Sequence, residues 1–232
     1  AKGMQVLVRE GTVSKDLAAL AELITTERAP FLSLCTDDRN PLDIAEEGHV
    51  DYLIRAAIGR GVRPLDAYRA ATWSAARHFG LVDRGLVAPG QRADIVLLKD
   101  LATCEVHSVI CRGAPVTPDR FRARPDVPLV GLDSVKLKPV TAATFHVPAG
   151  ADAPPVIGIR PGQILTDRLS APVTQRDGAF VADTETDVLK VAVLGRHNDH
   201  GNVGRGFAKG FGLQRGAIAS SVGHDSHNVC VI

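Results

Sequence analysis

The sequence lacks several features that would place it in a specialised class of protein. Its four cysteines are widely separated, with no CxxC motif, so they predict small buried side chains in a reducing compartment and not a disulfide framework. No apolar run approaches the roughly 20 residues that span a bilayer, and no signal-peptide pattern opens the chain. A net charge of +1 gives no reason to expect a nucleic-acid partner. We therefore predict a cytoplasmic protein that binds neither membranes nor nucleic acids.

Recurrent catalytic and nucleotide-binding motifs are also missing. The sequence contains no Walker A loop, Rossmann GxGxxG, nucleophile elbow or HExxH, and no HxE…PCxxC zinc pattern. Residues 201–206 are glycine-rich, but their spacing is not that of a phosphate loop, and they predict a turn. The remaining composition is average, with 45% hydrophobic and 23% charged residues among 232, which allows one large globular domain or two ordinary ones.

The first part of the chain alternates predicted strands and helices. The segments, in order, are a strand at 3–10, a helix at about 15–26 capped by Ser14, a strand at 31–35 buried on both faces, and helices at about 44–60 and 64–79. This order implies parallel strands joined by a right-handed crossover. It fits the end of a parallel barrel or of a doubly wound sheet, and both alternatives remain open.

From residue 85 the pattern changes to short antiparallel strands, at 93–98 and 106–110. A Pro- and Arg-rich stretch at 117–128 predicts a linker. Beyond it, apolar segments at 156–159, 188–194 and 216–222 are broken by glycine and proline, which predicts a mixed α+β domain. The predicted parts of the chain are therefore 1–84, 85–116, a linker at 117–130, and 131–232.

The polar turn after the second predicted strand is the first candidate for chemistry. Asp37 and Asp38 follow a buried apolar run and precede a helix with acidic residues in its first turn. Carboxylates in a loop at the C-terminal end of a parallel strand occupy the position where α/β barrels keep their catalytic groups. The alternative is that both side chains only cap the turn.

Four segments resemble one family in the order in which the family carries them. CTDDRNPLDIAEEGHVD, from Cys35, resembles the eighth-strand segment of bacterial adenine deaminases, members of the metal-dependent amidohydrolase superfamily. REGTVSKDLAAL, GLVAPGQRADIVLL and GFGLQRGAIASSVGHDSHNV resemble three further segments. The resemblance implies an α/β protein with the last strands and helices of a TIM-like amidohydrolase barrel, a small β domain and a C-terminal α+β domain.

The resemblance also implies a reaction. In the superfamily, the first carboxylate after the eighth strand contacts the metal and exchanges a proton with its bound hydroxide, and Asp37 matches that position. The implied activity is hydrolytic deamination of adenine to hypoxanthine and ammonia, with Mn or Fe, or alternatively Zn, as the divalent metal. N6-substituted adenines are an alternative substrate within the same chemistry.

Other residues near this turn are candidates with structural alternatives. Asp38 would support Asp37 or contact the substrate, or would cap the turn. His49 is predicted one to two turns into the following helix, as a substrate-loop or supporting residue or as an ordinary packing or surface residue. Arg9 and Glu10 end the preceding strand, where they would contact the purine or hold a loop, or form a structural ion pair.

The C-terminal segment HDSHN is the densest polar cluster in the sequence. His224, Asp225 and His227 could bind a first-row metal, but their spacing is not that of a structural zinc site. We predict that this motif helps to close the purine site; an independent metal site is the alternative. A second polar cluster around His197 and His200 is predicted to be a loop unless it packs against HDSHN.

The rest of the superfamily's metal centre has no counterpart here. It requires an H-x-H pair and further histidines before the last strand, and residues 1–36 contain no histidine. We therefore predict that the chain is part of a longer one and does not deaminate adenine alone. The alternative is a non-catalytic remnant that acts as a binding or assembly module. Apolar surface left by an absent half-barrel predicts a homo-oligomer.

Overall fold

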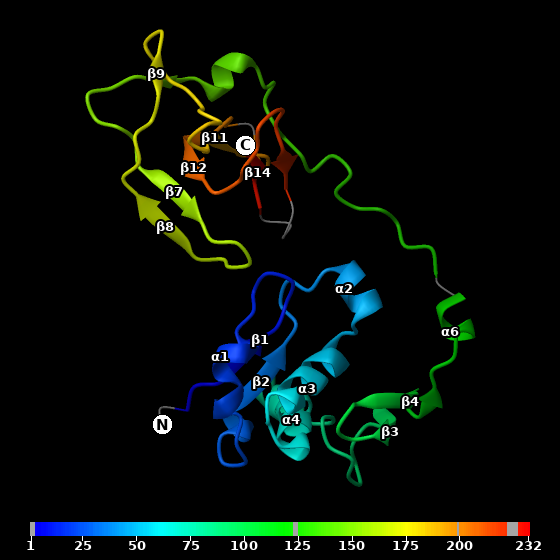
Figure 1. Ribbon diagram of the computed structural model, residues 1–232. Helices are drawn as coiled ribbons and strands as arrows, with labels where there is room; N and C mark the ends of the chain where they lie inside the picture. Colours follow the sequence, from blue (N-terminus) through cyan, green and yellow to red (C-terminus); the bar gives the residue numbers. More distant parts are fainter. Residues whose placement is uncertain (1–2, 123–124, 199, 222–226) are drawn as a thin grey trace. The chain divides into compact units, whose positions relative to one another are not determined.

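A computed structural model describes residues 3–122, 125–198, 200–221 and 227–232. The chain divides into two compact units, Ala1–Asp126 and Val127–Ile232, and each is described by itself. Within the described part of the chain, no helix is long and apolar enough to cross a membrane. Figure 1 shows the order of the elements along the chain.

The first unit begins with two short parallel strands that lie side by side (Figure 1). β1 (Val6–Arg9) pairs in parallel with β2 (Leu32–Cys35), and Arg9 lies opposite Cys35 in the register. The parallel pairing predicted from the strand–helix–strand order is therefore confirmed. The described residues of this unit contain no closed barrel, and its architecture is mixed α/β.

The helix predicted at 15–26 is much shorter in the structure. Within that range lie only α1 (Leu17–Leu20) and the 3-10 turn η1 (Ala21–Leu23); a further 3-10 turn, η2 (Ala29–Phe31), precedes β2. Asp16 occupies the N-cap position in place of Ser14. Ser14 belongs to the preceding loop because its backbone N–H donates to the carboxylate of Asp38, 3.2 Å away.

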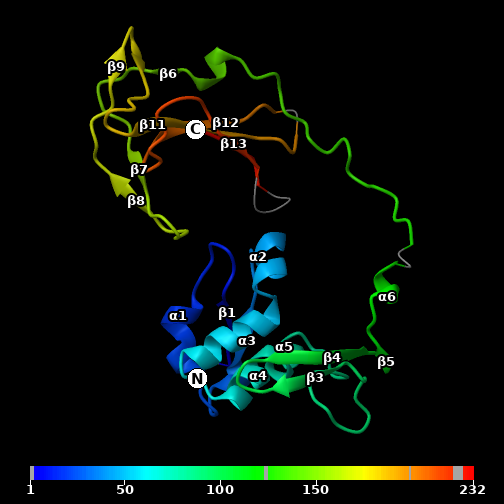
Figure 2. The same cartoon turned by 45° about the vertical axis from the view of Figure 1, so that its right-hand side comes forward.

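The two long helices predicted at 44–60 and 64–79 are each broken into two. The four helices are α2 (Pro41–Glu46), α3 (Val50–Gly59), α4 (Pro64–Ala71) and α5 (Trp73–His78). Gly48 makes the first break with φ 113°, a backbone conformation that glycine adopts readily. Thr72 makes the second, since its φ and ψ of −125° and −84° are not helical. Figure 2 shows α3, α4 and α5 gathered beside β1.

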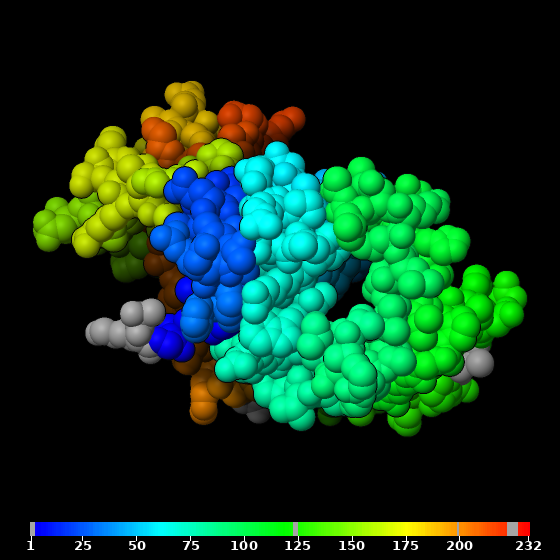
Figure 3. All heavy atoms as spheres, turned by 90° about the horizontal axis from the view of Figure 1, so that it is seen from below, coloured from blue at the N-terminus to red at the C-terminus, as the bar shows by residue number. Residues whose placement is uncertain are grey.

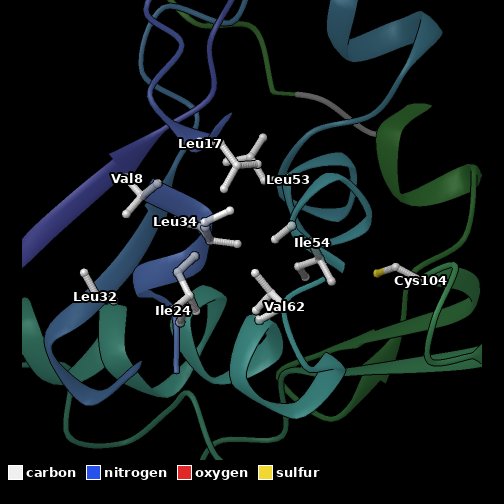
Figure 4. Packing of buried hydrophobic residues seen from close by; sticks show 13 residues of the cluster. Val8, Leu17, Ile24, Leu32, Leu34, Leu53, Ile54, Val62 and Cys104 are labelled. Atoms are coloured by element: carbon white, nitrogen blue, oxygen red, sulfur yellow. The ribbon is translucent and has the colours of Figure 1, made fainter. Parts of the chain in front are cut away.

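The helices pack against the strand pair, and residues 32–34 of β2 are all buried, so the predicted burial of this strand on both faces is confirmed. Val8 and Leu34, which are neighbours in the register, meet Leu17 and Leu53 in a cluster of thirteen buried residues (Figure 4). Val8, Leu17 and Leu53 have no exposed area, and fully burying one such side chain stabilises the fold by about 1.5–3 kcal/mol. This core fixes the strands whose ends carry the candidate site.

A small antiparallel sheet is attached to the same unit. Its strands, β3 (Ile95–Asp100), β4 (Glu105–Cys111) and β5 (Ala114–Pro115), confirm the antiparallel strands predicted here. Cys104 joins the helical core, and the Tyr68 hydroxyl donates to the carbonyl of Leu101 at 2.9 Å. Figure 3 shows the teal helical segment and the green segment of this unit in contact. The short helix α6 (Asp119–Arg122) follows the sheet.

The second unit is built of β-strands. Its larger sheet has the order β13-β14-β11-β12-β7-β8, and its smaller sheet has the order β6-β10-β9. The strands are β6 (Val147–Pro148), β7 (Val156–Ile159), β8 (Thr166–Leu169), β9 (Gln175–Arg176), β10 (Ala179–Phe180), β11 (Val188–Leu194), β12 (Val203–Lys209), β13 (Ala219–Ser220) and β14 (Val229–Val231). The 3-10 turn η3 (Ala142–Phe145) precedes them.

Two predictions for this unit are wrong. The mixed α+β domain contains no α-helix in its described residues, because glycine and proline divide the chain into runs too short for helices but long enough for strands. The glycine-rich residues 201–206 were predicted to be a turn, yet from Val203 onwards they belong to β12. Within the apolar segment 216–222, the described residues form only the short strand β13.

The core of the second unit lies on one face of its larger sheet. Phe207 and Val156 are opposite each other in the register, and both are buried. The Phe207 ring meets that of Phe180, from the smaller sheet, edge to face with centroids 6.3 Å apart. On β12, Gly204 and Gly206 lie on the face opposite to that of Phe207.

Candidate functional site

Asp37 has an unusual backbone conformation in the turn that follows β2. The turn is closed by a hydrogen bond of 3.1 Å from the Arg39 N–H to the carbonyl of Thr36. Asp37 has φ 47°, a left-handed conformation that costs an L-residue about 1–2 kcal/mol. Its side chain is 28% exposed, so the carboxylate remains accessible. Strained residues of this kind cluster at functional sites.

Arg9 lies beside Asp37 at the ends of the paired strands. Its Nε donates to Asp16 Oδ2 at 2.7 Å, and its terminal nitrogen is 3.8 Å from Asp37 Oδ2. The hydrogen bond to Asp16 and the negative charges of Asp16, Asp37 and Asp38 raise the pKa of Arg9. The structural ion pair considered for Arg9 is therefore present, and it aims the guanidinium at the carboxylate of Asp37.

Asp38 ties two loops together. Its carboxylate accepts backbone hydrogen bonds of 3.2 Å from Val13 and from Ser14, in the loop that follows β1. These bonds link the turn to another loop, whereas the turn cap considered for Asp38 would lie within its own turn. A side chain on Gly11 would not fit here, since its Cβ would lie 1.8 Å from Asp38 Oδ1.

Substitution of Gly11 tests this tie. We expect Gly11→Ala to lower the free energy of unfolding of the first unit by about 1–2 kcal/mol, because the Asp38 carboxylate must leave its two N–H donors. Gly59→Ala is the control: this helical glycine has open space around its Cβ, so alanine stabilises or leaves unchanged the same unit. Urea unfolding followed by fluorescence of Trp73, the single tryptophan, measures both. Equal effects of the two substitutions would contradict the account.

A second set of hydrogen bonds extends the tie to helix α2. The hydroxyl of Thr12 donates to Asp43 Oδ2 at 2.5 Å and accepts from the N–H of Asn40 at 3.0 Å. The side chain of Asn40 caps the helix by accepting from the N–H of Asp43 at 2.9 Å. Hydrogen bonds therefore link the loop after β1 and the start of α2 to the Asp37–Asp38 turn.

Arg39 is an organising residue that the sequence analysis missed. Its side chain is only 2% exposed and forms an ion pair with Glu47. Its Nε donates to the carbonyl of Gly48 at 2.8 Å, and its guanidinium lies 4.1 Å from the centre of the Tyr52 ring. These contacts hold α2 against α3 and fix the turn that begins two residues earlier, at Asp37.

Glu10 and His49 occupy different surroundings. Glu10 is buried, and one of its carboxylate oxygens has no hydrogen-bond partner among the described residues. His49 is an exposed N-cap residue of α3, and not a residue one to two turns into a helix, because the chain breaks at Gly48. Within the described part of the chain, no hydrogen bond or ion pair joins His49 to Asp37.

The C-terminal polar cluster is described only in part. His224 and Asp225 lie outside the described residues, whereas His227 is exposed. The carbonyl of His227 accepts from Arg196 Nε at 2.5 Å. Arg196, next to His197, thus contacts one described residue of the HDSHN segment, and packing of His197 against that segment stays a prediction.

The described residues do not form a metal centre. Across the described ranges, no group of three His, Cys, Asp or Glu side chains could hold a metal ion. Asp37 contributes one carboxylate, and its nearest charged neighbour is the cation of Arg9. Divalent metal sites require several converging ligands, so these residues do not fit a metal on their own.

Comparisons with known proteins agree with the division of the chain into two units, Ala1–Asp126 and Val127–Ile232. The model of the amidohydrolase family matches residues 5–116, and that of the adenine deaminase C-terminal domain matches residues 163–232. The chain is 58% identical over 233 residues to the adenine deaminase of Methylobacterium nodulans and 55% identical over 231 residues to adenine deaminase 1 of Rhizobium johnstonii. Each match covers 100% of this chain.

A third relative, the adenine deaminase of Gluconobacter oxydans, is 56% identical over 232 residues. The chain spans 41% of the length of each of these three curated relatives. The relatives match across both units, in the order of the two family models. The first unit therefore matches the amidohydrolase family, and residues 163–232 of the second match the adenine deaminase C-terminal domain.

Proposed function

We propose that this chain serves the hydrolytic deamination of adenine to hypoxanthine and ammonia, with Asp37 as its proton-transfer group. The observation that supports this proposal is the accessible Asp37 carboxylate, held in a left-handed turn at the C-terminal end of β2. Position and strain there are typical of catalytic groups in barrel enzymes. The names of the relatives supply the substrate.

The proposed chemistry requires a single carboxylate to move one proton twice. A water oxygen attacks C6 of adenine while Asp37 takes a proton from that water. The carboxyl then gives the proton to the exocyclic amine, the C6–N bond breaks, and ammonia leaves hypoxanthine behind. Arg9, 3.8 Å from Asp37, orients the carboxylate by charge. No step is assigned here to a metal, because the proposed Mn, Fe or Zn would need ligands beyond the described residues.

A chimeric enzyme tests the proposal. The chain replaces the matching segment of the Methylobacterium nodulans adenine deaminase, and the product is incubated with adenine. We expect stoichiometric hypoxanthine and ammonia. Parallel incubation with N6-methyladenine, which would release methylamine, separates the two substrate alternatives. A folded chimera with the metal content of the parent enzyme and no turnover of either purine would contradict the proposal.

A second candidate function is a non-catalytic binding or assembly module. The absence of a three-ligand metal cluster from the described residues favours it for the isolated chain. An inactive chimera that nevertheless assembles like its parent would support this alternative.

A further inference from the structure

A hollow of about 600 Å³ lies on the second unit, where β11, β12 and β14 meet. Val193 and Gly204 lie opposite each other in the register and form its floor. Its polar lining residues are His197 and three asparagines, Asn198, Asn202 and Asn228. The volume falls within the range of small-molecule sites, about 300–1,000 Å³, and an apolar floor with a polar rim is their usual design.

Two segments distant in the sequence are held together to make this hollow. Leu194 pairs with Val229, so β14 brings Asn228 beside the end of β11. The loop after β11 is fixed at Arg196, whose carbonyl accepts from the N–H of Lys136 at 2.7 Å and whose Nε donates to the His227 carbonyl. Backbone contacts therefore bring the asparagines of the two segments to one hollow.

Gly204 has no role within the fold that requires glycine. Its φ is not positive, and the register of β11 and β12 runs without a bulge past it. A Cβ built on Gly204 would come no closer than 4.0 Å to the rest of the protein. A glycine that costs strand stability without relieving strain marks a place where a ligand or another backbone approaches closely.

The polar lining residues indicate what kind of ligand approaches. The asparagines among them are uncharged, and each side-chain amide both donates and accepts. The side chains of Asn202 and Asn228 make no hydrogen bond to any residue in the described ranges, whereas Asn198 accepts from the N–H of His200 at 3.1 Å. A flat floor without a Cβ on Gly204 suits a planar ring, and amides pair with the N6 and N7 edge of adenine.

We propose that this hollow of the second unit binds a neutral purine base. The ring lies on Val193 and Gly204, and the amides of Asn202 and Asn228 read its edge. The choice of a purine over other planar, uncharged ring molecules rests on the proposed function. The existence of the hollow does not depend on the proposed function, because all its lining residues lie in the second unit.

The test is a titration of the 232-residue chain with adenine, followed by NMR of the asparagine side-chain amides. We expect saturable shifts at Asn202 and Asn228. Gly204→Leu fills the floor and is expected to weaken binding by at least about tenfold. Gly206→Leu is the matched control: it lies on the same strand and face, its Cβ would have 3.8 Å of clearance, and it does not line the hollow. Its affinity should stay within about twofold of the parent chain.

Several outcomes would overturn the proposal. They are unchanged chemical shifts for all three asparagine amides, an equal loss of adenine affinity in the two leucine variants, or chemical-shift changes confined to the residues around Asp37. If adenine causes no chemical-shift change and Gly204→Leu instead changes the oligomeric state measured by light scattering, the hollow is a protein interface. Because the titration requires no turnover, its result is independent of whether the chimeric enzyme is active.

Discussion

Replacement of Asp37 by asparagine is expected to lower kcat for adenine in the chimeric enzyme by about three orders of magnitude. A positioned general acid–base group contributes about 10²–10⁴-fold, and the amide of asparagine cannot carry the proton. The fold should survive, because asparagine tolerates the left-handed conformation that Asp37 adopts at φ 47°. Steady-state rates of hypoxanthine formation measure the loss, with the metal content of both proteins determined alongside.

The matched control is Asp177→Asn in the second unit. Asp177 is also an aspartate with positive φ, at 50°, and its side chain is exposed. Its replacement therefore reproduces the change of charge and backbone preference away from the proposed site. We expect an unchanged rate for this variant. A loss of less than about tenfold at Asp37 would remove that residue from the mechanism.

Arg39→Met is expected to lower the free energy of unfolding of the first unit by about 3 kcal/mol. The substitution removes a charged donor from the carbonyls of Gly48 and Asp43 and a cation from the face of Tyr52. Hydrogen bonds from charged groups are worth about 1.5–3 kcal/mol each, and methionine regains part of this by packing. Because the side chain is 2% exposed, water cannot replace these contacts without opening the core.

Urea unfolding monitored by Trp73 fluorescence measures this change in the first unit. Arg122→Met is the control, since Arg122 pairs with Asp119 on the surface of the same unit, with side chains 79% and 80% exposed. Such pairs contribute about 0–1 kcal/mol. We also expect Arg39→Met to reduce the activity of the chimera at urea concentrations too low to unfold it. The reason is that the Asp37 turn starts beside this anchor. Equal stability of the two variants would show that Arg39 is not an anchor.

The strand pair and its polar turn were predictable from the sequence alone. An apolar run at 31–35 that ends abruptly in charged residues is typical of a buried strand followed by a loop, and the order of elements required parallel pairing. The helix breaks were harder to predict. The apolar pattern continues through Gly48 and Thr72, and periodicity does not report a backbone that changes direction while the same face stays buried.

The second unit shows where pattern analysis fails. Strands of two to four residues, such as β9 and β13, are too short to display alternation, so a mixed domain was predicted in place of a β domain. The glycines at 204 and 206 were assigned to a turn because a strand has no internal need for them. The structure places both glycines inside a strand, with a Cβ at each position meeting nothing closer than 3.8 Å.

The candidate site was only partly accessible to sequence analysis. Asp37 was identified by the position of its carboxylate and by resemblance to a family. The tie from Asp38 to Ser14 spans 24 positions, and the contact of Arg39 with Tyr52 depends on how α2 folds back on α3. Interactions of this kind follow from the three-dimensional path of the chain, which leaves no local signal in the sequence.

The most direct test of the account compares ammonia release from adenine by the chimera and by the isolated chain, in one assay with added Mn²⁺ or Fe²⁺. We assign proton transfer to this chain, and we assign the remaining ligands of the metal to residues outside those described. We therefore expect turnover by the chimera and none by the chain alone. Turnover by the isolated chain, or none by a folded chimera with its metal bound, would contradict it.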